Sequence, residues 1–124
     1  MGNESYHARI AGEHLQGAAE ELKKKRASNV AFLSMRALEQ MIEACASKEG
    51  LHFHENPRTA HKSRRDWLRA RQPDLAVYWD RLWGIYGALG YGGKNGDRAS
   101  EAEATARRCL SELSRREKIA VTGL

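Results

Sequence analysis

Apolar residues recur at helical spacing through the segment 28–48, and this pattern restricts the fold more than any other feature of the chain. Five of them make up one face: Ala31, Met35, Leu38, Ile42 and Cys45. Because they are three or four positions apart, they indicate an amphipathic helix. Ser28 or Asn29 is expected to cap its start, and Gly50 to end it in a left-handed conformation. The face can serve a monomer core or a dimer seam.

A second helical pattern covers residues 4–25. Ala11, Leu15, Ala18 and Leu22 follow one another at spacings of four, three and four. The segment ends in KKKR, and cations are favourable at a helix C-terminus. Because only a short link separates the two long segments, we expect them to form a helical hairpin.

The remainder of the chain is also predicted to be helical. The chain has only two prolines, at positions 57 and 73, and few β-branched residues. Helices are expected over about 60–71, with Thr59 as its cap, and over about 74–89. Another should begin at Ser100, which forms a capping-box pattern with Glu103. The final residues, IAVTGL, are expected to pack loosely.

These elements predict an all-α fold. Amphipathic helices with short links give an antiparallel up-and-down bundle of four to five helices. With 124 residues, the chain is long enough for a single domain, 1–124, with one core.

Composition restricts the environment and the class of partner. No apolar run is long enough to cross a membrane, and the N-terminus lacks a secretory pattern, so we expect a cytoplasmic protein with no membrane contact. The two cysteines, Cys45 and Cys109, are interpreted as buried apolar residues without a disulfide. A formal charge of +5 favours anionic partners such as RNA or nucleotides, although a solvated basic surface explains it equally well.

Histidines gather in the stretch GLHFHENPRTAHKSRR, residues 50–65. His52, His54 and His61 are candidate metal ligands. Helix-borne sites place two histidines four positions apart, whereas 52 and 54 are two apart in an expected loop. The spacing matches no tetrahedral template, so we expect no metal and regard these three as weak candidates.

A cationic stretch follows on the expected third helix. His61, Arg64, Arg65 and Arg69 combine a proton acceptor with cations, as RNA cleavage beside a 2′-hydroxyl requires. Residues 61, 65 and 69 share one helical face, which indicates either an anion-binding ridge or a solvated basic face. His61, Arg65 and Arg69 are the weak catalytic candidates, and Arg64, Arg65 and Arg69 are the candidates on this helix for binding an anion.

The glycine-rich link GYGGKNG at 90–96 suggests a phosphate loop but lacks its register. Asn95 stands where Ser or Thr is required, and no strand precedes it. We expect no cofactor, and only a looser anion contact through Lys94 and Asn95.

Aromatic residues cluster across the expected third and fourth helices: Trp67, Tyr78, Trp79, Trp83 and Tyr86. Aromatic rings stack on the bases of single-stranded nucleic acid. At helical spacing they are more often core residues, and we expect most of them to be buried.

The order of elements resembles the HEPN superfamily of small nucleotide-binding helical proteins. The likeness lies in Ala11 through Leu22, in SNVAFLSMRALEQMIEACASKEG followed by the histidine-bearing HFHENPRTAHK, and in ALGYGGKNGDRASEAEATARRCLSEL. It implies a bundle of four or five helices, usually a homodimer, with a link to RNA or nucleotides. Many members are ribonuclease toxins or are partnered by a nucleotidyltransferase antitoxin.

The family's active motif is an arginine followed four to six residues later by a histidine. Here Tyr86 stands where that arginine is expected, and no histidine follows His61. Arg9 and His14 have the spacing but lie on the first helix. The leading hypothesis is therefore a HEPN-like protein that binds RNA or a nucleotide without the usual catalytic motif. The alternatives are a ribonuclease toxin using His61 and nearby arginines, and a non-catalytic protein-interaction module.

Overall fold

The computed structural model describes residues 3–90 and 96–124, and its side chains over 3–87 and 98–124. Five α-helices and one short 3-10 turn account for most of this chain: α1 (Glu4–Lys23), α2 (Ala27–Ser47), the turn η1 (Phe53–Glu55), α3 (Ala60–Arg71), α4 (Ala76–Gly90) and α5 (Gly96–Glu117). The described residues contain no strand. The predicted all-α class is confirmed.

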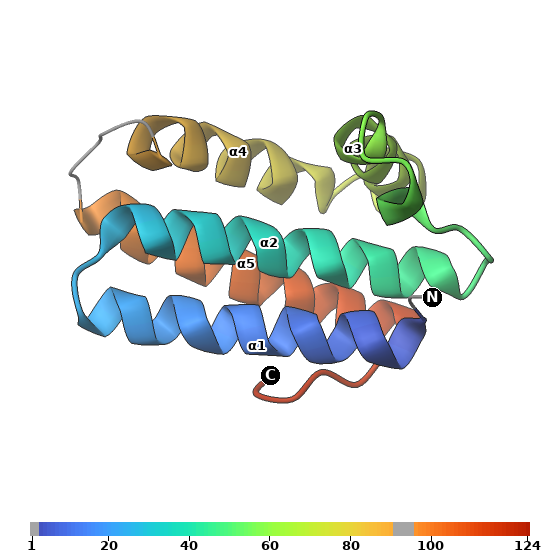
Figure 1. Cartoon of the computed structure of the whole chain (residues 1–124), viewed down its shortest axis with the longest axis horizontal. Helices are drawn as coiled ribbons and strands as arrows, with labels where there is room; N and C mark the ends of the chain where they lie inside the picture. Colours follow the sequence, from blue (N-terminus) through green and yellow to red (C-terminus); the bar gives the residue numbers. More distant parts are fainter. Residues whose placement is uncertain (1–2, 91–95) are drawn as a thin grey trace.

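Four of the helices run alternately up and down the bundle (Figure 1). α2 returns antiparallel to α1, α4 runs back beside α2, and α5 returns beneath both. α3 lies across the bundle at the end where α2 finishes. The predicted antiparallel up-and-down bundle is confirmed, with α3 as its one transverse element.

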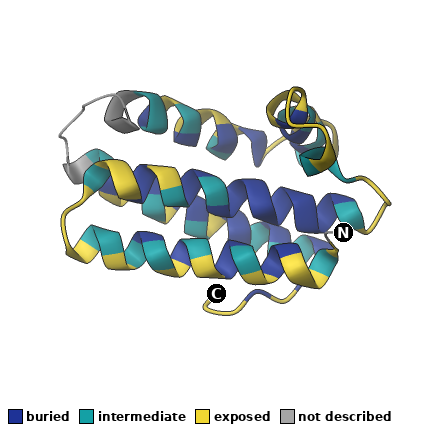
Figure 2. Cartoon of the chain, in the orientation of Figure 1, coloured by how far each residue is buried: buried dark blue, intermediate teal, exposed yellow. Residues whose placement is uncertain are grey.

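α2 is the central helix of the bundle (Figure 2). Its residues 37–46 are buried without interruption, because α1, α3, α4 and α5 surround this half of the helix. The predicted stripe from Ala31 to Cys45 lies wholly in the core of the single chain. Any dimer must therefore form through another surface.

The helix ends differ from the predicted ones in three places. Thr59 takes the N-cap position of α3, as predicted, but its side chain makes no capping hydrogen bond. α2 begins after Arg26 with no side-chain cap, so the expected cap by Ser28 or Asn29 is wrong. Asn29 instead donates to Glu21 Oε1 at 2.6 Å across the hairpin turn. α5 begins at Gly96, so Ser100 lies inside the helix and the expected capping box is wrong. Gly50 has φ +78°, as predicted.

Both cysteines are buried and free, as predicted. Burial raises the pKa of the Cys45 thiol, and likewise that of Cys109, to about 12. Among the described residues, no helix is long and apolar enough to span a membrane.

The C-terminal segment is packed, against expectation. Lys118 takes a left-handed conformation, and Ile119 N donates to Ser114 O at 3.0 Å, which reverses the chain at the end of α5. Ile119 and Val121 are buried, and the segment runs back along α1 (Figure 1). The sequence pattern missed this because the apolar residues here are too few to show a period.

Gly12 on α1 makes this close approach possible. A Cβ atom at Gly12 would lie 2.9 Å from Thr122 O and 3.3 Å from Val121 Cγ1. We predict that Gly12→Ala lowers the free energy of unfolding by about 1–3 kcal/mol, because the backbone at 122 must move. Urea unfolding followed by circular dichroism measures this change.

Gly84→Ala is the matched control, because nothing lies within 4 Å of a Cβ there. Removing a helical glycine should raise stability by about 0.5–1 kcal/mol. Equal effects of the two substitutions would show that the C-terminal segment does not rest on Gly12.

Candidate functional site

The three histidines proposed as metal ligands do not come together. His52 and His54 lie beside each other at η1, with ring centroids 5.9 Å apart. His61 lies on α3, where its ring contacts the rings of Trp79 and Trp83. The distances between ring centroids are 5.2 Å and 4.2 Å, respectively. Of the three, only His54 belongs to a group able to hold a metal ion in the described part of the chain. The grouping of His52, His54 and His61 is therefore wrong.

Arg64, one of the residues expected to bind an external anion, points into the protein. The inward face of α3 consists of Ala60, Arg64 and Leu68, which recur every fourth residue. Arg64 Nε lies 2.7 Å from Glu43 Oε2, and its Nη1 lies 3.3 Å from Glu39 Oε2. Two carboxylates of α2 already neutralise this guanidinium, so it is not available to an external anion.

Glu43 is the most enclosed of these charges, with a fully buried side chain. Besides Arg64, it contacts His54 Nδ1 through Oε1 at 3.1 Å. Burial alone would raise the pKa of Glu43, but the hydrogen bonds with His54 and Arg64 outweigh burial and hold the pKa below its usual value. Glu43 is therefore a carboxylate at neutral pH.

Glu39, one turn earlier on α2, links this buried pair to the surface. Its Oε1 accepts a hydrogen bond from Arg36 Nη1 at 2.9 Å, while its Oε2 faces Arg64. We name Arg36, Glu39, Glu43 and Arg64 the α2 charge network. It holds two cations and two anions, so it is neutral overall.

From the sequence we did not predict Arg36, Glu39 and Glu43 of this network, nor His7 and Gln40 beside it. His7 of α1 is 2 % exposed, and its Nδ1 lies 2.7 Å from Gln40 Oε1. Burial lowers the pKa of His7, despite the opposing hydrogen bond with Gln40. A signal was present, because Glu39, Gln40 and Glu43 interrupt an otherwise apolar run on α2. Polar residues at fully buried helix positions indicate partners on neighbouring helices.

The aromatic residues form a continuous row over the outer side of α2, α3 and α4. His61 contacts Trp83, Trp83 contacts Tyr86 at 5.4 Å, and Tyr86 contacts Phe32 at 6.4 Å between ring centroids. We name these four residues the aromatic row. Of the predicted core aromatics, only Trp79 is fully buried; Trp67, Tyr78, Trp83 and Tyr86 are half-buried at the edge of the core.

An open pocket of about 160 Å³ adjoins the row. It is lined by Phe32, Met35, Arg36, Glu39, Trp83 and Tyr86. Phe32 is 47 % exposed, so one side of its ring is open to solvent at the pocket. Trp83 Nε1 is buried and has no hydrogen-bond partner among the described residues.

The remaining predicted residues lie on the outer side of α3 or outside the described residues. Arg65 is half-buried and lies 3.5 Å from Asp66 Oδ1. Arg69 is exposed and pairs with Asp80 at 3.3 Å. His61, Arg65 and Arg69 thus share the solvent side of α3, as their spacing predicted. Lys94 and Asn95 lie outside the described residues.

Comparison with known proteins provides no further assignment. No protein-family model, curated protein sequence or solved structure matches this chain.

The inward and outward arginines of α3 should differ sharply in their effect on stability. We predict that Arg64→Leu lowers the free energy of unfolding by about 3–5 kcal/mol, because it leaves the buried Glu43 carboxylate without its cation. Arg65→Leu, one position along, should change it by less than about 1 kcal/mol, because Arg65 is partly solvated. Urea unfolding of both variants is the measurement, and similar losses would contradict the assignment of Arg64 to the interior.

Proposed function

We propose that this chain is a HEPN-like binding protein that takes up single-stranded RNA or a nucleotide on the aromatic row. The observation that carries the proposal is the run of ring contacts from His61 to Phe32 beside a pocket that includes Arg36. Bases stack on exposed aromatic side chains, and arginines contribute contacts with phosphates and with base planes.

The charges around the row support an anionic ligand. Arg36 is 40 % exposed at the pocket, and Arg65 and Arg69 lie on the solvent side of α3. Glu39 also lines the pocket, but both of its oxygens face arginines, so it opposes an anion only weakly. The formal charge of +5 adds long-range attraction for phosphates.

The unpaired donor of Trp83 supports the same proposal. A buried N–H without an acceptor is energetically unfavourable. A base carbonyl that reaches Nε1 after a small movement of the ring would gain this missing hydrogen bond. The row therefore offers one directional contact in addition to stacking.

Binding without cleavage is favoured by the surroundings of the arginine–histidine pair on α1. Arg9 is exposed and forms an ion pair with Glu13 at 2.8 Å. Arg9 and His14 belong to α1, whereas the aromatic row is built from α2, α3 and α4.

A ribonuclease centred on His61 is the second candidate. Burial against the tryptophans lowers the pKa of His61, and Glu39 opposes that shift only partly. The imidazole is therefore neutral at pH 7 and able to accept a proton, with Arg65 near enough to influence it. This is the chemistry that a toxin of this class would need from the chain.

Partners remain part of the proposal. The resemblance to the HEPN superfamily implies a homodimer and a nucleotidyltransferase antitoxin. Phe32 and Val77, which are 47 % and 56 % exposed, are large apolar residues that a protein partner would cover. In that case the chain acts as a non-catalytic protein-interaction module.

Phe32→Ala tests RNA binding with little risk to folding, because the ring is half outside the protein. We predict that it weakens binding of a fluorescent oligoadenylate by about 1–3 kcal/mol, or roughly 5- to 150-fold, through loss of one stacking contact. Fluorescence anisotropy gives the affinity, and AMP as competitor separates nucleotide binding from RNA binding.

Val77→Ala is the control, because it removes an exposed apolar side chain outside the row. It should leave the affinity unchanged. Wild-type affinity should also fall as salt rises, because phosphate contacts release counterions. No binding at low salt, or equal losses in both variants, would refute the proposal.

The same oligonucleotide separates binding from catalysis. We predict that it stays intact during prolonged incubation with the protein, as judged on a denaturing gel. Cleavage that disappears in His61→Ala would instead establish that the protein is a ribonuclease that depends on His61. Cleavage that persists in that variant would exclude His61 as the proton acceptor.

A further inference from the structure

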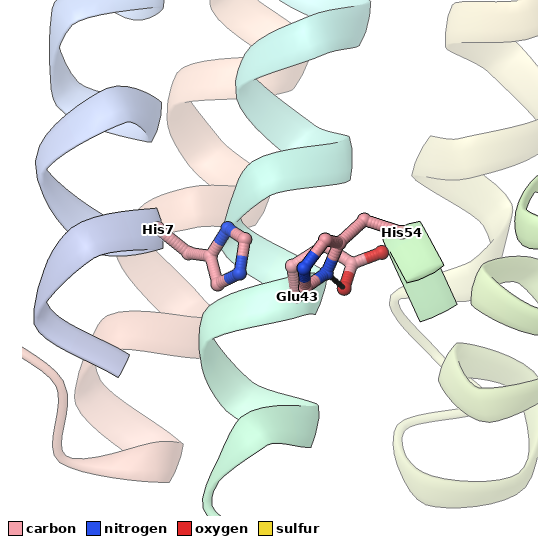
Figure 3. Close-up of side chains that lie close together, drawn as sticks. All are labelled: His7, Glu43 and His54. Atoms are coloured by element: carbon pink, nitrogen blue, oxygen red, sulfur yellow. Dashed lines mark hydrogen bonds and ion pairs between the residues drawn. The ribbon is translucent and has the colours of Figure 1, made fainter. Parts of the chain in front are cut away.

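Three side chains from separate parts of the chain converge at Glu43 of the α2 charge network (Figure 3). His7 comes from α1, Glu43 from α2 and His54 from η1, and each offers one ligand atom within 4.8 Å of the others. The rings of His7 and His54 are 4.8 Å apart between centroids. Residues 7, 43 and 54 are far apart in sequence, so their meeting depends on the tertiary fold.

His7 is arranged as a metal-ligating histidine usually is. Gln40 Oε1 can only accept a hydrogen bond, so His7 Nδ1 at 2.7 Å carries the proton. The other nitrogen, Nε2, then has a free lone pair. It is buried and has no hydrogen-bond partner in the part of the chain that the structure describes. In metal centres, a hydrogen bond at one ring nitrogen commonly orients the ring and leaves the other for the ion.

The distances are close to those of a tetrahedral centre. Zinc–nitrogen and zinc–oxygen bonds of about 2.0–2.1 Å place neighbouring ligand atoms about 3.3 Å apart. His54 Nδ1 and Glu43 Oε1 are already 3.1 Å apart. The carboxylate oxygen can only accept, so His54 Nδ1 now carries a proton; an ion bound at Nδ1 would displace it, and the proton would move to His54 Nε2. The ligand atoms all lie within 4.8 Å of one another, so side-chain movements of about 1.5 Å would complete the set.

Glu43 supplies a fixed negative charge for a cation. Its Oε2 is held by Arg64 at 2.7 Å, which leaves Oε1 directed at His54. Arg64 also repels a cation, but Glu39 faces that guanidinium and offsets part of the repulsion. Two imidazoles with one carboxylate are a ligand set of catalytic zinc sites, in which water takes the fourth position.

We propose that His7, Glu43 and His54 bind one divalent transition-metal ion, for which zinc is the best match. The site is distinct from the aromatic row, and its existence does not depend on RNA binding. His54 is 29 % exposed, so the ion would enter from the η1 side. When bound, it would join α1, α2 and η1 and so stabilise this end of the bundle.

Titration of metal-free full-length protein with zinc tests the proposal. Isothermal calorimetry should give one ion per chain, and the melting temperature should rise with zinc because the ion binds the folded state. Cobalt in place of zinc should give the intense visible bands of a four-coordinate centre. No binding, or binding without a rise in melting temperature, would overturn the proposal.

Variants locate the ion. His54→Ala should weaken zinc binding by at least about tenfold, since even removal of residues behind a ligand has effects of 10- to 100-fold. His54 is only half-buried, so this variant should fold, and circular dichroism checks that it does. His7→Ala should have the same effect on zinc, and a lower stability does not obscure a titration carried out well below its melting temperature.

His61→Ala is the matched control. His61 lies on α3 against Trp79 and Trp83, outside the proposed ligand set. It should bind zinc as the wild type does. Zinc affinity unchanged in His54→Ala, or lost equally in His61→Ala, would show that the ion binds adventitious surface histidines and would overturn the site.

Discussion

The buried pairing of Arg64 with Glu43 and Glu39 is the interaction on which this end of the bundle depends. An isolated charge inside a protein is strongly unfavourable, and removing one member of a buried pair leaves the other uncompensated. Glu43 is fully buried on the central helix, so α3 must be placed where Arg64 reaches it. α3 buries Ala60, Arg64 and Leu68, and its half-buried Trp67 packs against the core. The buried ion pair and this apolar packing together fix the position of α3.

The far end of α3 is attached in the same way, but more weakly. Arg71 contacts Glu117 of α5 through two nitrogens, at 3.0 and 3.1 Å, and Glu49 at 2.9 Å. Its side chain is 40 % exposed, so solvent screens this second attachment. α3 is thus held firmly at Arg64 and loosely at Arg71. The aromatic row crosses α3 only through His61, close to the firm attachment, which keeps the row in register with α2 and α4.

Sequence periodicity predicted the bundle well because apolar spacing is a local property of each helix. It failed where a contact joins distant segments. The stripe on α2 predicted one buried face, but residues 37–46 are buried on every side of the helix because four helices surround it. The buried residues of α3, Ala60, Arg64 and Leu68, are four positions apart, and this spacing places residue 64 on the inward face. Its charge nevertheless led us to count Arg64 among the residues that bind an external anion. His7 and His54 are 47 positions apart, so no spacing rule could join them. We grouped His52, His54 and His61 because they are close in sequence. In the fold, His54 instead lies beside His7 of α1 and Glu43 of α2.

Both candidate sites rest on opposite sides of one neutral network. Arg36 faces the pocket beside the aromatic row, and Glu43 faces His54 and His7, with Glu39 and Arg64 between them. Glu39 is the residue common to both sides, because its Oε1 accepts from Arg36 at the pocket while its Oε2 faces Arg64, the partner of Glu43. The order of charges along α2 thus keeps each buried or half-buried charge beside one of opposite sign, which is the condition for placing two carboxylates inside the bundle.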